Sequence, residues 1–95
     1  MGYRLRPKAR QDLSGIIAYI ARDNPSAARK WRDEIFRVFE LLGGSPFIGS
    51  AHDEMAPDIR MFPSGNYIVL YRVEEAGVLV LRVIHAARDW RQQSI

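Results

Sequence analysis

The segment VLRVIHAARDW, Val80 to Trp90, places a histidine, two arginines, an aspartate and a tryptophan at the end of an apolar run. An imidazole can act as an acid or a base near neutral pH, so His85 is the first candidate for catalysis. Asp89 is the one nearby carboxylate that could orient its ring, and no serine nucleophile stands in a glycine-flanked turn. A histidine at a strand end can equally be a structural residue held by hydrogen bonds. These residues therefore form either an active site or the polar edge of a binding domain.

The other residue patterns that could indicate a metal, carboxylate or phosphate site are weak. His52 stands beside Asp53 and Glu54, but the only other histidine is far away in sequence and the chain has no cysteine, which makes a poor metal site. The two glutamates at 74–75 fit a solvated turn, and no glycine-rich phosphate loop joins a strand to a helix. We therefore expect no metal and no cofactor.

Arginine supplies most of the positive charge. The chain has 14 Lys+Arg against 11 Asp+Glu, a formal net charge of +3 and a pI of about 9.7. This balance favours an acidic partner, either nucleic acid or an acidic polypeptide, although a solvated basic surface would give the same counts. Arginines on neighbouring strands can converge on phosphates or carboxylates, or can pair with nearby acidic residues. The candidates are Arg60, Arg72, Arg82 and Arg88.

The elements that position these residues begin with a strand and two helices. The 95 residues, 47% of them hydrophobic, suffice for one domain with a single core. Residues Tyr3 to Pro7 alternate apolar and basic side chains and predict a short edge strand. Apolar residues at helical spacing predict one helix from Pro7 to about Arg22. A second runs from Pro25 to Gly43 with Asn24 as its N-cap, and the short connection makes an antiparallel hairpin.

Three further strands follow the loop SPFIGSAHDEMAP. They are DIRMF, NYIVLYRV and VLVLRVIH, and their short turns require antiparallel pairing. The last two are apolar on both faces: Tyr67, Val69, Tyr71 and Val73 alternate with Ile68, Leu70 and Arg72, and Val78, Val80 and Ile84 alternate with Leu79, Leu81 and Val83. One helical hairpin can cover only one face. The second face needs another cover, which is either the loop with the C-terminal segment or a partner chain.

The N-terminal sequence MGYRLRPKAR lacks the apolar core of a signal peptide, and no apolar run reaches the length needed to span a bilayer. Together with the absence of cysteine, this favours a soluble cytoplasmic protein that does not associate with membranes.

Four segments resemble, in order and spacing, the ParE branch of the ParE/RelE superfamily of type II toxin–antitoxin toxins. They are YRLRPKARQDL, NPSAARKW, SPFIG and DIRMFPSGNYIVLYRVEEAGVLVLRVIHAARDW, which together cover nearly the whole chain. The resemblance implies a single α+β domain over residues 1–95, with an N-terminal strand at the edge of a small antiparallel sheet, a helical hairpin packed on it and a short C-terminal segment. It also implies a ParD-like antitoxin whose acidic, amphipathic C-terminal segment wraps the toxin. Operator DNA would be reached only indirectly, through that antitoxin.

The superfamily contains two activities. RelE-like members cut mRNA in the ribosomal A site, whereas ParE-like members trap DNA gyrase with its DNA cleaved. The ribonuclease pattern transfers poorly to this chain, because the expected strand arginine falls at Ile68 and the expected C-terminal tyrosine falls near Ser94, while Arg88 is retained. A phosphodiester cutter needs cations on the developing charge and a poised proton donor. His85 is the one residue that could replace the missing acid–base group.

We therefore expect a non-enzymatic gyrase inhibitor that is neutralised by its antitoxin. The residues expected to contact target or antitoxin are Arg60, Arg72, Arg82, His85, Arg88, Asp89 and Trp90. The expected antitoxin groove consists of Ile68, Leu70, Leu79, Leu81 and Val83. Trp90 either anchors an interface or folds back over the sheet. Two alternatives stay open: an mRNA endonuclease that uses His85 and Arg88, and an inactive homologue that acts only as a corepressor with its antitoxin.

Overall fold

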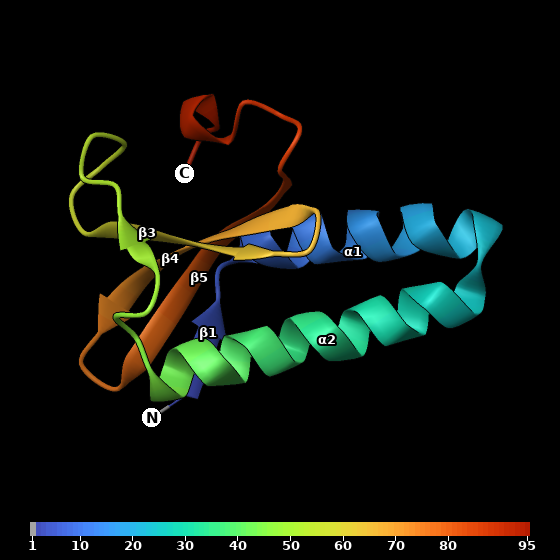
Figure 1. Cartoon of the computed structure of the whole chain (residues 1–95), viewed down its shortest axis with the longest axis horizontal. Coiled ribbons are helices and arrows are strands. Elements are labelled where there is room, and N and C mark those ends of the chain that lie inside the picture. The colour runs from blue at the N-terminus through green and yellow to red at the C-terminus, as the bar shows by residue number, and fades with distance from the viewer. Residues whose placement is uncertain (1) are drawn as a thin grey trace.

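The two helices form the hairpin that the sequence predicts. In the computed structural model, which describes residues 2–95, α1 spans Pro7–Asp23 and α2 spans Pro25–Gly44. Each begins with a proline, whose missing N–H is harmless in the first helical turn. The predicted cap is confirmed, since the Asn24 side chain accepts a hydrogen bond from the Ala27 N–H at 3.1 Å. The connected ends of the hairpin project beyond the sheet (Figure 1).

The sheet has five strands in the order β1-β5-β4-β3-β2. They are β1 (Gly2–Leu5), β2 (Ser50–Ala51), β3 (Ile59–Ser64), β4 (Tyr67–Glu74) and β5 (Gly77–His85). The antiparallel pairing of β3, β4 and β5 and the edge position of β1 are confirmed, as is the α+β class. However, β1 pairs with β5 in parallel, so the sheet is mixed, and the short strand β2 was not predicted.

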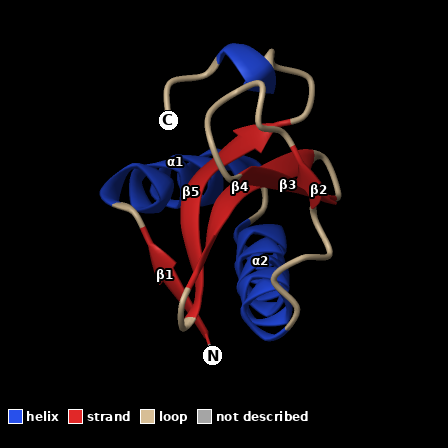
Figure 2. Cartoon of the chain, turned by 90° about the vertical axis from the view of Figure 1, so that its left-hand side faces the viewer, coloured by secondary structure: helices blue, strands red, loops and turns tan. Residues whose placement is uncertain are grey.

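The chain itself covers both faces of the sheet. The helices lie on one side, and the loop before β3 and the C-terminal segment lie on the other (Figure 2). The helix-side core contains Ala9, Leu13, Ile35, Phe39, Leu42, Val69, Tyr71, Val78, Val80 and Val83. The second-face core contains Ile59, Ile68, Leu70, Leu81 and Ile84, against which Met55, Ala56, Trp90 and Ile95 pack. Of the two covers that the sequence allows, the structure has the loop and the C-terminal segment.

A β-bulge in β5 changes which face its last residues occupy. Leu70 lies opposite Arg82 while Tyr71 lies opposite Val80, so Leu81 is an extra residue in the ladder. One extra residue inverts the alternation beyond it. Val83 therefore belongs to the helix-side core and Ile84 to the second-face core, and the predicted alternation was wrong for these two.

A buried ion pair joins α1 to β5 beyond the end of β1. The Asp12 carboxylate accepts hydrogen bonds from Arg82 Nε at 2.8 Å, from Arg82 Nη2 at 3.0 Å and from the Val83 N–H at 3.0 Å. Arg82 Nη1 also donates to the Ser94 carbonyl at 2.6 Å. The Arg82 and Asp12 side chains are only 8% and 15% exposed. Arg82 thus connects β5, α1 and the C-terminal segment.

Replacing Asp12 by alanine should lower the free energy of unfolding by about 3–5 kcal/mol, because it leaves the Arg82 guanidinium buried without its counter-charge. Urea denaturation measures this change. The matched control is Glu74→Ala, which breaks the solvent-exposed pair with Arg4 and should have little effect on stability. Equal unfolding midpoints for the two variants would contradict the assignment of Asp12 as a structural residue.

Candidate functional site

A pocket of about 750 Å³ lies where the helical hairpin passes the end of the sheet. Its walls come from α1, from Trp31 of α2, from the turn between β3 and β4, and from the end of β5. It is lined by Gln11, Asp12, Gly15, Ile16, Tyr19, Ile20, Trp31, Asn66, Tyr67, Val83, Ile84, His85 and Arg88. Its volume is in the range of sites that bind small molecules or several side chains.

Aromatic rings form much of this pocket. Tyr67 contacts Trp31 on one side and His85 on the other, each with 5.1 Å between ring centroids and with the rings steeply inclined. Burial and, less strongly, the nearby Tyr19 phenol raise the pKa of the Tyr67 phenol. Tyr19 is 68% exposed, which is unusual for so large an apolar ring. The sequence analysis did not identify Tyr19, Trp31 or Tyr67 as site residues.

His85 is exposed at the rim, and its ring is oriented by the backbone. Its Nδ1 accepts a hydrogen bond from the Ala87 N–H at 3.0 Å, so the neutral ring carries its proton on Nε2. Among residues 2–95, no hydrogen bond joins this ring to the Asp89 carboxylate, which was the predicted orienting group. The geometry is that of a strand-end histidine whose ring is held by a backbone hydrogen bond, with Nε2 as the donor of the neutral ring.

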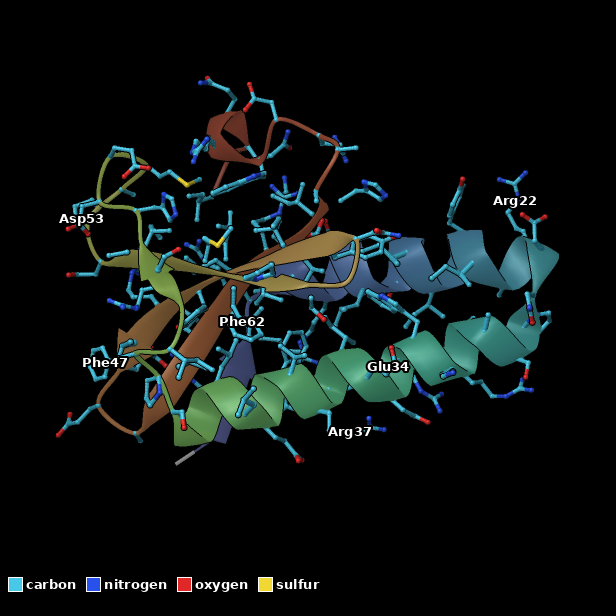
Figure 3. All side chains as sticks on the ribbon, viewed as in Figure 1. Arg22, Glu34, Arg37, Phe47, Asp53 and Phe62 are labelled. Atoms are coloured by element: carbon cyan, nitrogen blue, oxygen red, sulfur yellow. The ribbon has the colours of Figure 1, made fainter. Side chains whose placement is uncertain are left out.

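Arg60 holds the loop that follows α2. Its Nε and Nη2 donate to the Gly49 carbonyl at 3.1 and 2.7 Å, and Nη2 also donates to the Phe47 carbonyl at 3.2 Å. The Tyr71 hydroxyl fixes the same loop by donating to the Pro46 carbonyl and accepting from the Gly49 N–H. The Phe47 ring remains 70% exposed at the side of the molecule away from the hairpin turn (Figure 3). The Arg60 guanidinium is thus engaged within the chain.

The other predicted arginines differ in their surroundings. Arg82 is buried and bonded to Asp12, as described above. Arg72 is half-buried on β4; the hydrogen bond from Arg4 and, more weakly, the nearby charge of Arg72 lower the pKa of the Glu74 carboxyl. Arg88 is exposed at the pocket rim. Only this last arginine shares the pocket with His85.

Trp90 folds back over the second face, which decides between its two predicted positions. Its ring meets the His52 ring edge-on at 5.2 Å, and the Arg91 guanidinium lies over it at 4.7 Å. His52 Nδ1 lies 2.7 Å from a Glu54 carboxylate oxygen, and this hydrogen bond lowers the pKa of Glu54. Asp89, next to Trp90, is exposed.

The residues predicted to form an antitoxin groove do not form an open groove in this structure. Ile68, Leu70 and Leu81 are 5%, 0% and 0% exposed beneath the loop and the C-terminal segment. Leu79 is half-buried on the same face, and Val83 faces the helices. A partner would have to displace the C-terminal segment to reach them. Of the predicted residues, His85, Arg88 and Asp89 are exposed, and His85 and Arg88 line the pocket.

Within residues 2–95, no group of three or more histidine, aspartate or glutamate side chains lies where it could hold a metal ion. None of the helices in this part of the chain is both long and apolar enough to cross a membrane.

Comparison with known proteins confirms the resemblance. Residues 3–90 match the family model described as the ParE toxin of the type II toxin–antitoxin system parDE. The chain is 30% identical over 89 residues to Toxin ParE1 from two strains of Mycobacterium tuberculosis, CDC 1551 / Oshkosh and ATCC 25618 / H37Rv, covering 92% of this chain and 91% of each relative.

A solved structure shares the fold. The structure titled "Chromosomal ParDE TA system from P. aeruginosa" contains a chain that superposes with a TM-score of 0.76 at 20% identity, covering 90% of this chain and 95% of that one. The family match extends over both helices and all five strands. The chain therefore belongs to the ParE family of toxins of type II toxin–antitoxin systems.

Proposed function

We propose that this ParE-family toxin inhibits DNA gyrase by trapping the gyrase–DNA complex in its cleaved state, and that a ParD-type antitoxin neutralises it by binding. The similar chain from P. aeruginosa comes from a ParDE system, which supports an antitoxin of this type as the partner. The observation that favours inhibition by binding over catalysis is the engagement of Arg60 and Arg82 inside the protein. Gyrase acts in the cytoplasm, which is the compartment that this proposal requires.

Cleavage of RNA would need more than the pocket rim offers. A phosphodiester cutter places cations on the developing phosphate charge and a proton donor beside the leaving oxygen. His85 and Arg88 share the rim, which is the observation that favours the endonuclease alternative. However, Arg82 is neutralised by Asp12 and Arg60 is bonded to loop carbonyls, so neither supports a phosphate there. One exposed histidine and one exposed arginine suit a binding surface better than a nuclease centre.

The first test adds the purified protein to gyrase, supercoiled plasmid and ATP, and measures linear DNA after protease treatment. We expect linear DNA to accumulate, and to disappear when the antitoxin is added first. Unchanged plasmid combined with transcript cleavage during translation would replace the proposal by the endonuclease alternative. Unchanged plasmid combined with harmless expression in cells would leave the corepressor alternative.

The double variant His85→Ala/Arg88→Ala tests whether the rim carries the toxic surface. Both side chains are exposed, and the variant loses only the contact of the His85 ring with Tyr67, so it should keep its fold with a small change in its unfolding midpoint. We expect about tenfold less linear DNA, as is typical when two contact residues of a binding surface are lost.

The control for that variant is Arg37→Ala, which removes one exposed arginine from α2, well away from the C-terminal end of β5 (Figure 3). It should leave the yield of linear DNA unchanged. A folded rim variant that poisons gyrase as well as the control does would place the toxic surface elsewhere.

A further inference from the structure

We infer that Ser50, His52 and Glu54 form a nucleophilic site that hydrolyses small acyl esters, an activity separate from the proposed action on gyrase. The three residues alternate along β2 and the turn that follows it, and hydrogen bonds join their side chains in sequence order. A nucleophile bonded to a base, and a base bonded to a group that orients it, are the arrangement used by serine hydrolases.

The hydrogen bonds determine which nitrogen of the His52 ring carries the proton. Nδ1 lies 2.7 Å from a Glu54 carboxylate oxygen, and this hydrogen bond lowers the pKa of the Glu54 carboxyl. The ionised carboxylate can only accept, so the proton lies on Nδ1. In the neutral ring Nε2 is then the acceptor, and it lies 3.2 Å from the Ser50 hydroxyl oxygen, which donates to it. His52 is therefore placed to take the Ser50 proton.

Packing holds the His52 ring in this position. The ring meets the Trp90 ring edge-on at 5.2 Å, and only 16% of the His52 side chain is exposed. The backbone is fixed as well, because the His52 N–H donates to the Ile59 carbonyl at 2.8 Å. A general base must lie within hydrogen-bond reach of the proton that it removes. The contacts around His52 maintain that reach.

Ser50 lies at an edge of the sheet where a substrate can approach. β2 is the last strand in the sheet order, next to β3 (Figure 2), and both Ser50 and Ala51 are exposed. Because the His52 N–H points toward β3, the alternation of an antiparallel ladder turns the Ala51 N–H outward. The N–H of the residue after the nucleophile is a donor to the oxyanion in serine hydrolases. The edge of β2 thus offers a backbone donor beside the nucleophile.

The surroundings of Ser50 suit a short acyl group. Ser50 lies opposite Met61 in the ladder, so the half-buried Met61 side chain lies beside it on the same face. This thioether provides apolar contact for a chain such as acetyl, in a position that stays open to solvent. The expected substrates are therefore small esters.

The reaction proceeds in two halves. Ser50 Oγ forms a bond to the acyl carbon while its proton passes to His52 Nε2, and the leaving alcohol takes that proton as its bond to the carbon breaks. Water then attacks the acyl group on Ser50, with His52 again accepting the proton and returning it to Ser50 Oγ as the carboxylic acid leaves. Glu54 acts as a positioning residue, because it orients the ring and stabilises the imidazolium that forms.

The first test treats the full chain with a fluorophosphonate that carries a fluorescent tag, which an activated serine attacks at phosphorus with loss of fluoride. Peptide mapping should place the tag on Ser50, and Ser50→Ala should not be labelled. The matched control is Ser14→Ala, which removes an exposed serine from α1 and should be labelled like the wild type. An unlabelled wild type, or labelling that persists in Ser50→Ala, overturns the inference.

The second test measures steady-state hydrolysis of para-nitrophenyl acetate. Ser50→Ala should lower kcat/KM by about 100-fold or more. Glu54→Gln should lower kcat by about tenfold while KM stays unchanged, because the carboxylate does not touch the ester. Circular dichroism and the unfolding midpoint verify that both variants fold. Unchanged kcat in Glu54→Gln would mean that these hydrogen bonds only stabilise the loop, and would overturn the assignment.

Discussion

The structure depends on the pair formed by Arg82 and Asp12. Where β1 ends, the edge of β5 would be left with an unpaired backbone donor, and the Asp12 carboxylate supplies its acceptor while also neutralising Arg82. The third nitrogen of the same guanidinium donates to the Ser94 carbonyl. One charged group in an otherwise apolar strand thus fixes the position of α1 on one side and of the C-terminal segment on the other. An unpaired charge at this depth would be strongly unfavourable. Losing either Arg82 or Asp12 alone would therefore destabilise the fold.

The C-terminal segment has consequences for where a partner can bind. It covers the second face through Trp90 and Ile95, so the hydrophobic surface of the central strands is already used within the chain. What stays accessible is the end of the sheet, where the hairpin projects and aromatic rings remain partly exposed. The other large apolar side chains that are exposed, Leu41, Phe47 and Ile48, lie near the end of α2 and in the loop that follows it. The pocket therefore lies at the end of the sheet, because both faces of the sheet are covered within the chain.

Local patterns predict the parts of this fold that local rules govern. Helical spacing, Asn24 and the prolines predict both helices, and alternation with short turns predicts the three antiparallel strands. The parallel pairing of β1 with β5 joins segments that are distant in sequence, and the bulge at Leu81 inside the β4–β5 hairpin has no residue pattern that marks it. The same distinction holds at the site. His85 and Arg88 stand out by residue type, whereas Tyr19 and Tyr67 join them only because α1 and β4 both border the same pocket.

The parallel pairing of β1 with β5 also constrains when the protein can complete its folding. The first strand to leave the ribosome finds its hydrogen-bonding partner, Gly77–Val80, only after five other elements have been synthesised. The helical hairpin can form early from local contacts, but its sheet-facing apolar side chains cannot pack against β5 until that strand emerges. Such a chain remains unassembled through most of its own translation. The pocket at the end of the sheet is lined by Val83, Ile84 and His85, so it too is complete only after this last strand has been synthesised.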